Sequence, residues 1–178
     1  MFYLVAGRII VIEAFDEWTH RAVSEVFSGW FFDLVPPQIT ADANATIRIH
    51  SGVDLPTIPP DLKSFEITCD GRCYTDDRQY YLTFDHAMVV FGTDGADDVD
   101  FWLAKTYDHS SITFVQLLSQ ALAPALRRSG VFEIHSAGVI SPESKSAIMI
   151  AGTSGSGKST LTTSSAVLAS VMPGVTPR

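Results

Sequence analysis

Short segments in which apolar and polar residues alternate recur along the N-terminal part of the chain and predict β-strands. Residues 2–13 are mostly apolar and are interrupted at Gly7, so we expect a strand pair or one bent strand there. Residues 45–50, ATIRIH, predict a further strand, whereas the proline-rich stretch GVDLPTIPPD predicts a loop. Between Ser64 and Ala104 the pattern predicts a small antiparallel layer, with strands in SFEITC, RCYTD, QYYLTF, AMVVFG and VDFWLA.

Two segments instead repeat apolar residues at helical spacing. The first covers residues 17–30, and we expect it to end before Pro36 and Pro37, which cannot continue a helix. Its apolar face consists of Trp18, Ala22, Val26 and Trp30. The second is capped by Ser110 or Ser111 and has a stripe formed by Val115, Leu118, Leu122 and Leu126.

The end of the second helix carries several signals. Pro124 lies inside the pattern and should kink or split the helix. Arg127 and Arg128 follow it, where positive charge complements the helix dipole. Gly130 is placed to end the helix. We expect this helix to open a second domain, which sets a domain boundary between residues 108 and 109.

The composition is that of a globular protein, because 46% of the 178 residues are hydrophobic and 18% are charged. The formal net charge is -8. This acidity argues against nucleic acid or an anionic membrane as a general partner. No apolar run approaches the roughly 18 residues of a spanning helix, and the N-terminus lacks a basic leader. We therefore expect a soluble, cytoplasmic protein.

The two cysteines, Cys69 and Cys73, lie in the segment CDGRC. They could form a redox or metal pair, or flank a hairpin turn at Asp70 and Gly71 as reduced thiols. A zinc site needs four ligands and the sequence has no partner pair, so we favour the turn. The acidic run at residues 94–100 lacks the EF-hand loop pattern and is interpreted as a solvated turn.

The strongest chemical signal is AGTSGSGKST at residues 151–160, which fits G-x-x-x-x-G-K-[ST]. Its glycines let successive backbone N–H groups point inward, and the start of the following helix adds a positive dipole end. Lys158 supplies a mobile positive charge for phosphates, Ser159 is placed to ligate Mg²⁺, and Thr160 is a second hydroxyl. The expected phosphate-binding residues are Gly152, Thr153, Ser154, Gly155, Ser156, Gly157, Lys158, Ser159 and Thr160.

The surroundings of the motif make a chance match in a Gly/Ser-rich loop less convincing than a binding site. The apolar segment SAIMIAG at residues 146–152 predicts a strand that leads directly into the loop. VFEIHSAGVI at residues 131–140 predicts a buried strand before it. A helix is expected from Lys158 to about residue 170, although the β-branched residues there have weak helix propensity.

Residues 115–163, with VFEIHSAGVI ahead of SAIMIAGTSGSGKSTLT, resemble the HPr kinase-related family, which shares its fold with phosphoenolpyruvate carboxykinase. That family carries a histidine in an H-[AS]-A context in the strand before the loop lysine, and here the match is His135-Ser136-Ala137. The resemblance implies transfer of the ATP γ-phosphate to a serine of a protein or other acceptor, with Mg²⁺ as cofactor. It also implies that His135 lies close to the phosphates; without it, His135 is an ordinary histidine of a buried strand.

The expected fold is therefore α/β in two parts. Residues 1–108 would form a mixed α/β domain with an antiparallel sheet. Residues 109–178 would form the first part of an HPr kinase/phosphoenolpyruvate carboxykinase-like phosphate-loop domain. The phospho-acceptor, an unknown protein or small molecule, has no signature in the sequence. The open edge of an incomplete sheet would favour self-association, so a homo-oligomer is one expected state.

The family places catalytic acids, commonly an Asp pair, on a strand after the loop helix, yet no Asp or Glu follows Glu143. We therefore expect a truncated or frame-disrupted product that lacks its catalytic acids. The alternative is a non-catalytic nucleotide-binding or partner-binding module. An ABC-type ATPase would need an acidic Walker B strand and an LSGGQ-like signature, and the sequence has neither.

Overall fold

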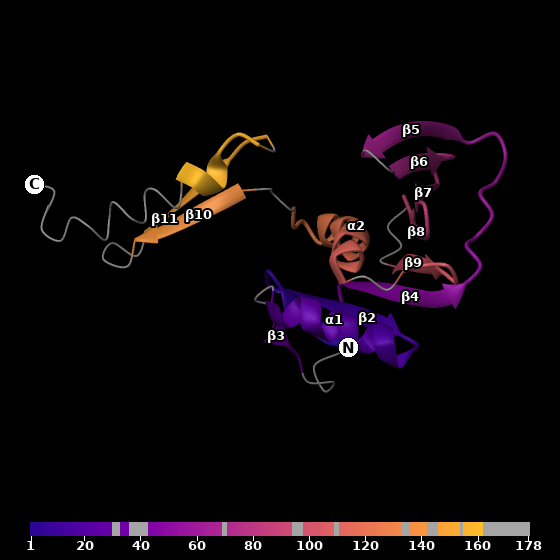
Figure 1. Cartoon of the computed structure of the whole chain (residues 1–178), viewed down its shortest axis with the longest axis horizontal. Coiled ribbons are helices and arrows are strands. Elements are labelled where there is room, and N and C mark those ends of the chain that lie inside the picture. The colour runs from indigo at the N-terminus through magenta and orange to yellow at the C-terminus, as the bar shows by residue number, and fades with distance from the viewer. Residues whose placement is uncertain are drawn as a thin grey trace, which may run out of the picture. The chain divides into compact units, whose positions relative to one another are not determined.

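The computed structural model describes residues 1–29, 33–35, 43–68, 71–93, 98–108, 111–132, 136–141, 146–153 and 155–161. The chain forms two compact units, Met1–Phe132 and Glu133–Arg178 (Figure 1). The boundary that we expected between residues 108 and 109 lies inside the first unit. The difference arises because the helix that follows residue 110 packs on the sheet of the first unit.

A nine-stranded mixed sheet forms the frame of the first unit, in the order β3-β1-β2-β4-β9-β8-β7-β6-β5. Its strands are β1 Phe2–Val5, β2 Arg8–Ala14, β3 Asp33–Leu34, β4 Ala45–Val53, β5 Lys63–Thr68, β6 Gly71–Thr75, β7 Gln79–Phe84, β8 Ala87–Gly92 and β9 Asp98–Ala104. β4 pairs in parallel with both β2 and β9, and all other neighbours are antiparallel. The expected mixed α/β class with an antiparallel sheet is confirmed for this unit.

The first strands form the predicted strand pair. β1 and β2 are joined by a tight turn in which Ala6 and Gly7 both have positive φ, at 49° and 78°. Helix α1, Glu17–Gly29, and strand β3 lie in the connection from β2 to β4, which is parallel to β2. Such a crossover is the usual way to connect parallel neighbours. The helix ends before Pro36 and Pro37, as expected.

The four strands β5 to β8 form a meander inserted between β4 and β9. The proline-rich stretch after β4 has no regular structure, as its sequence predicts. Each strand of the meander then pairs with the next, and β9 returns to lie beside β4. The predicted antiparallel layer is therefore part of the larger sheet, because its last strand also joins a parallel neighbour.

Helix α2, Ser111–Arg128, runs unbroken past Pro124, so the expected split does not occur. Pro124 lies in the last turns, where its missing N–H removes one hydrogen bond from the helix. Packing of the apolar stripe holds the rest of the helix, since Leu118 and Leu122 are buried. Gly130 follows with a φ of 76° and donates to the Arg127 carbonyl, which confirms its predicted role.

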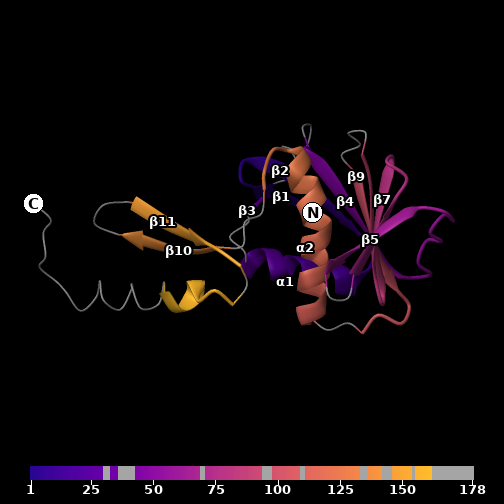
Figure 2. The same cartoon turned by 90° about the horizontal axis from the view of Figure 1, so that it is seen from above.

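Both helices cover the same face of the sheet (Figure 2). Register places Ile49, Phe101 and Val89 side by side on neighbouring strands of this face, and all three are fully buried. Helix α1 meets α2 through Trp18, whose ring lies edge-on to Phe114 with centroids 5.3 Å apart. This continuous core explains why α2 belongs to the first unit.

The described part of the second unit contains one antiparallel pair, β10 Ser136–Ser141 and β11 Ser146–Ala151. The predicted strand at residues 146–152 is confirmed. Of the predicted strand at residues 131–140, Val131 and Phe132 are not in a strand, residues 133–135 lie outside the described residues, and the rest belongs to β10. In the described parts of both units, no helix has the length and apolar character needed to cross a membrane.

Candidate functional site

Strand β11 leads straight into the candidate phosphate-binding loop. Ser136 pairs with Ala151, and the loop begins at the next residue, Gly152. The β-branched residues Ile148 and Ile150 favour the strand. The end of a two-stranded ladder therefore fixes where the loop starts, as the sequence SAIMIAG predicts.

The glycines of the loop adopt conformations that other residues rarely reach. Gly155 and Gly157 have φ values of 76° and 78°, in the left-handed region. A Cβ atom placed on Gly152 would lie 2.9 Å from Ser156 Oγ, which is closer than normal packing allows. The motif positions thus meet the backbone requirements of a tight loop whose amides can turn toward a ligand.

Lys158 is the charged centre of the loop and is 8% exposed. Its Nζ donates to the carbonyl oxygens of Gly152 at 2.9 Å and Thr153 at 2.7 Å. These two bonds join Lys158, near the end of the loop, to the first two residues of the loop. An ammonium has three donors, so one proton remains for a further acceptor. The side chain therefore stabilises the loop and keeps a positive charge inside it.

A helix begins at Lys158, as predicted, and is described as far as Leu161. Its first helical hydrogen bond runs from Leu161 N to Gly157 O at 2.9 Å. The amides of Lys158 and Thr160 precede that bond, at the end of a helix where anions are favoured. Ser159 and Thr160 are exposed in this first turn.

The structure brings together eight of the expected phosphate-binding residues, from Gly152 to Thr160 without Ser154. Ser154 and His135 lie outside the described residues, so the expected place of His135 near the phosphates stays a prediction. Within the ranges that the structure describes, no group of three or more His, Cys, Asp or Glu side chains is arranged to hold a metal ion.

No family model matches the chain. Comparisons with curated proteins and with solved structures found no match either. The assignment of the loop therefore depends on its motif and on its geometry. The resemblance to the HPr kinase-related family stays a basis for proposals.

Two other features of the first unit are polar contacts that the sequence analysis did not predict. His50 Nε2 lies 2.8 Å from Asp100 Oδ1, and the His50 ring stacks on Trp102 with centroids 3.9 Å apart. Arg128 donates through Nη2 to the Gly92 carbonyl. The alternation in β4 and β9 could have placed His50 and Asp100 on one face, but only the parallel register makes them neighbours.

Proposed function

We propose that this chain binds the phosphates of ATP through the loop Gly152–Thr160 and is the nucleotide-binding part of an HPr serine kinase-like protein. In its full-length form such a protein would transfer the ATP γ-phosphate to a serine of a protein or other acceptor. The observation that carries the proposal is the buried Lys158 ammonium held at the centre of a loop with two left-handed glycines.

The present partners of Lys158 support phosphate binding on energetic grounds. Its ammonium donates to two neutral carbonyl oxygens. A phosphate oxygen carries a negative charge, so it attracts the ammonium more strongly than a neutral carbonyl oxygen does, most of all in a partly buried site. A phosphate oxygen that enters the loop can therefore compete for this ammonium. The early amides of the helix would orient the same phosphate through their dipoles.

The donor set also fits Mg²⁺ as a companion of the nucleotide. Mg²⁺ usually keeps several waters and takes only one or two protein ligands besides phosphate oxygens. A single hydroxyl, Ser159, next to Lys158 in the first helical turn is sufficient on the protein side. The metal would neutralise phosphate charge, while the loop itself binds and orients the nucleotide.

A second candidate is a non-catalytic nucleotide-binding or partner-binding module. One observation favours it: residues 144–178 contain neither Asp nor Glu, so this segment supplies no carboxylate to position a metal or to accept the serine proton. Under this proposal the loop binds ATP and no phosphate is transferred.

Calorimetric titration of ATP·Mg²⁺ tests the binding site itself. The wild-type chain should bind, and Lys158→Ala should bind at least about tenfold more weakly, because a charge-assisted bond is lost. The matched control is Lys105→Ala, which removes an exposed lysine paired with Asp54 in the first unit. Equal affinities for wild type and Lys158→Ala would show that the loop is not a nucleotide site.

A second measurement separates the two candidates once binding is established. ADP formation from ATP·Mg²⁺ is followed with the chain alone and with the chain extended to any further coding sequence. ADP release that depends on Lys158 supports the kinase-like enzyme. Saturable ATP binding without ADP release in either form supports the non-catalytic module.

A further inference from the structure

A cavity of about 610 Å³ lies in the first unit between helix α2 and the strands β5 to β8. Its sheet wall is apolar and includes Phe65, Cys73 and Leu82, which register places side by side on β5, β6 and β7. Its helix wall includes Ala123 and Pro124. This volume lies within the range of roughly 300 to 1,000 Å³ that is usual for small-molecule sites.

The cavity exists because the apolar face of the sheet is wider than the helices that cover it. Helix α2 makes its main contacts with β4, β9 and β8. The apolar row continues beyond them to Phe65, which is 52% exposed. On the same wall the rings of Tyr80 and Phe91 stack with centroids 5.2 Å apart. An apolar surface of this kind gains free energy when a ligand removes it from water.

The polar end of the cavity is cationic. Among the described residues that line it, the charged ones are Arg127 and Arg128, at the end of α2. Arg128 Nη2 donates to the Gly92 carbonyl, whereas Nη1 is buried and has no hydrogen-bond partner among the described residues. A guanidinium presents donors in a fork that matches two oxygens of one anion.

The helix dipole does not account for this arrangement by itself. Positive charge is favourable at a helix C-terminus. The last carbonyls of α2, however, already accept from backbone amides: Ser129 donates to Leu126 and Gly130 donates to Arg127. Arg128 instead reaches across to the sheet. Its guanidinium therefore adds to the charge of Arg127 at the wall of the cavity.

We propose that this cavity binds a small amphiphilic carboxylate, whose apolar body lies against Phe65, Leu82 and Phe91 and whose carboxylate accepts from Arg128. Charge complementarity selects this ligand class, because the cavity is apolar and the charged residues that line it, Arg127 and Arg128, are both cationic. The proposal concerns the first unit and does not depend on the function of the phosphate-binding loop.

Competition binding tests both the place and the charge. The fluorescent aromatic sulfonate 1-anilinonaphthalene-8-sulfonate should bind saturably to the full chain. Decanoate should displace it at concentrations about tenfold lower than 1-decanol does, since the alcohol lacks the charge-assisted bonds. Equal displacement by the acid and the alcohol would overturn the proposal.

Two variants and a control locate the site. Arg128→Gln should remove the preference for decanoate, and Ala123→Phe should fill the cavity and abolish displaceable probe binding. Arg72→Gln is the matched control, because this substitution removes the same charge from an exposed position on β6. Far-UV circular dichroism checks that each variant folds. Unchanged binding in a folded Arg128→Gln or Ala123→Phe would also overturn the proposal.

A third measurement needs no change in the cavity wall. Cys73 is buried in that wall, and in a Cys69→Ser background its labelling by iodoacetamide can be followed by mass spectrometry. Decanoate should slow the labelling more than 1-decanol at the same concentration. No protection would count against the site. Light scattering tests whether the cavity is instead an interface between two copies of the chain. A wild-type dimer that Ala123→Phe converts to a monomer would overturn the ligand site in favour of that interface.

Discussion

The two units of the chain are held by different kinds of interaction. The first unit buries a continuous apolar core between one face of a nine-stranded sheet and two helices. In the second unit, among side chains that the structure describes, Lys158 alone is buried, while Ile148 and Met149 are more than half exposed. The difference teaches that the stability of the first unit depends on a filled apolar core. The structure of the loop depends instead on backbone conformation and on one polar side chain.

Removal of buried volume in the first unit should give the largest effect. Phe101→Ala empties a fully buried position on the central strand β9 and should cost about 3–5 kcal/mol of unfolding free energy. Urea denaturation measures it. Phe15→Ala is the control, because Phe15 is 70% exposed and should change stability by no more than about 0.5 kcal/mol. Similar losses from both variants would contradict the idea of a volume-dependent unit.

A change of backbone conformation should matter most in the loop. Gly157→Ala puts a Cβ atom on a residue with a φ of 78°, which costs about 1–2 kcal/mol. If the loop binds ATP, its affinity should fall about fivefold to thirtyfold. Gly138→Ala is the control, because its Cβ would meet only the Ile148 carbonyl at an ordinary 3.8 Å. Calorimetry of ATP binding compares them, and equal affinities would remove the conformational argument.

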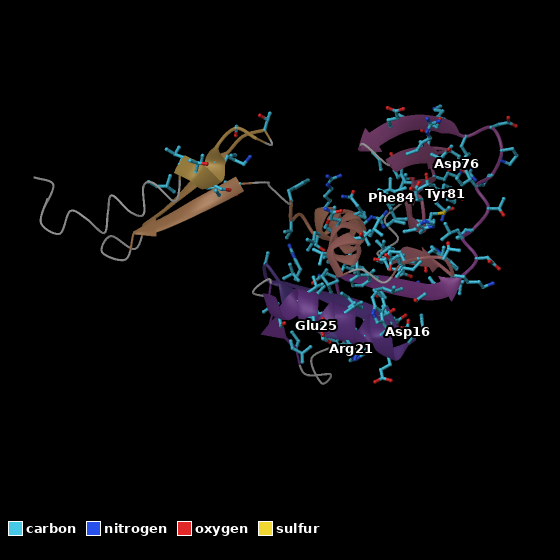
Figure 3. The ribbon with its side chains drawn as sticks, viewed as in Figure 1. Asp16, Arg21, Glu25, Asp76, Tyr81 and Phe84 are labelled. Atoms are coloured by element: carbon cyan, nitrogen blue, oxygen red, sulfur yellow. The ribbon has the colours of Figure 1, made fainter. Side chains whose placement is uncertain are left out.

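A helix cap tests whether polar bonds also contribute in the first unit. Asp16, at the start of α1 in Figure 3, accepts from Thr19 N at 2.8 Å and from Thr19 Oγ1 at 2.6 Å. Asp16→Ala should cost about 1 kcal/mol in urea denaturation. Asp16→Ser retains a capping oxygen and should recover most of the loss. Equal losses from both variants would mean that the cap is not the source of the effect.

The smallest effect is expected at a turn of the first unit and depends on pH. Asp76 Oδ1 accepts from the amides of Arg78 and Gln79, both at 2.9 Å, and these bonds lower the pKa of Asp76 (Figure 3). Because the folded pKa lies below the unfolded one, the stabilisation is present above the unfolded pKa and is lost as pH falls through the folded pKa.

The test compares Asp76→Asn with the wild type. Asparagine can accept the same two hydrogen bonds but does not titrate, so the variant should lose stability less steeply than the wild type under acidic conditions. Thermal melts between pH 5 and pH 2 measure the difference. Parallel curves for the two proteins would show that this carboxylate does not contribute to the acid sensitivity.

Local pattern predicted most elements of the fold and little of their assembly. Alternation located the strands up to Ala104 except β3, which the sequence did not predict, and the motif placed the helix start at Lys158. The apolar stripe of α2 predicted a helix but not the sheet that it covers, because an apolar face does not specify which surface it packs against. The place of β9 beside β4 depends on pairing between distant residues, such as Arg48 and Asp98, and no local pattern contains it.

The candidate site also has features that the sequence predicted and features that it did not. The glycines and the lysine of the loop were predicted, since their types follow from the conformations and charge that a phosphate requires. The bonds from Lys158 to the carbonyls of Gly152 and Thr153 were not, because they describe what the ammonium does without a phosphate. The cavity beside α2 depends on the width of the sheet relative to a single helix, which only the assembled unit reveals.

The parallel pairing of β4 with β9 has a consequence for how the first unit folds. The strands β5 to β8 pair with sequence neighbours and can close early, whereas β4 and β9 must meet across the whole meander. Closure of so long a chain segment costs entropy before its contacts form. We therefore expect the meander to gain amide protection before β4 does. Pulsed hydrogen exchange during refolding would measure this order, and simultaneous protection of β4 and β7 would refute it.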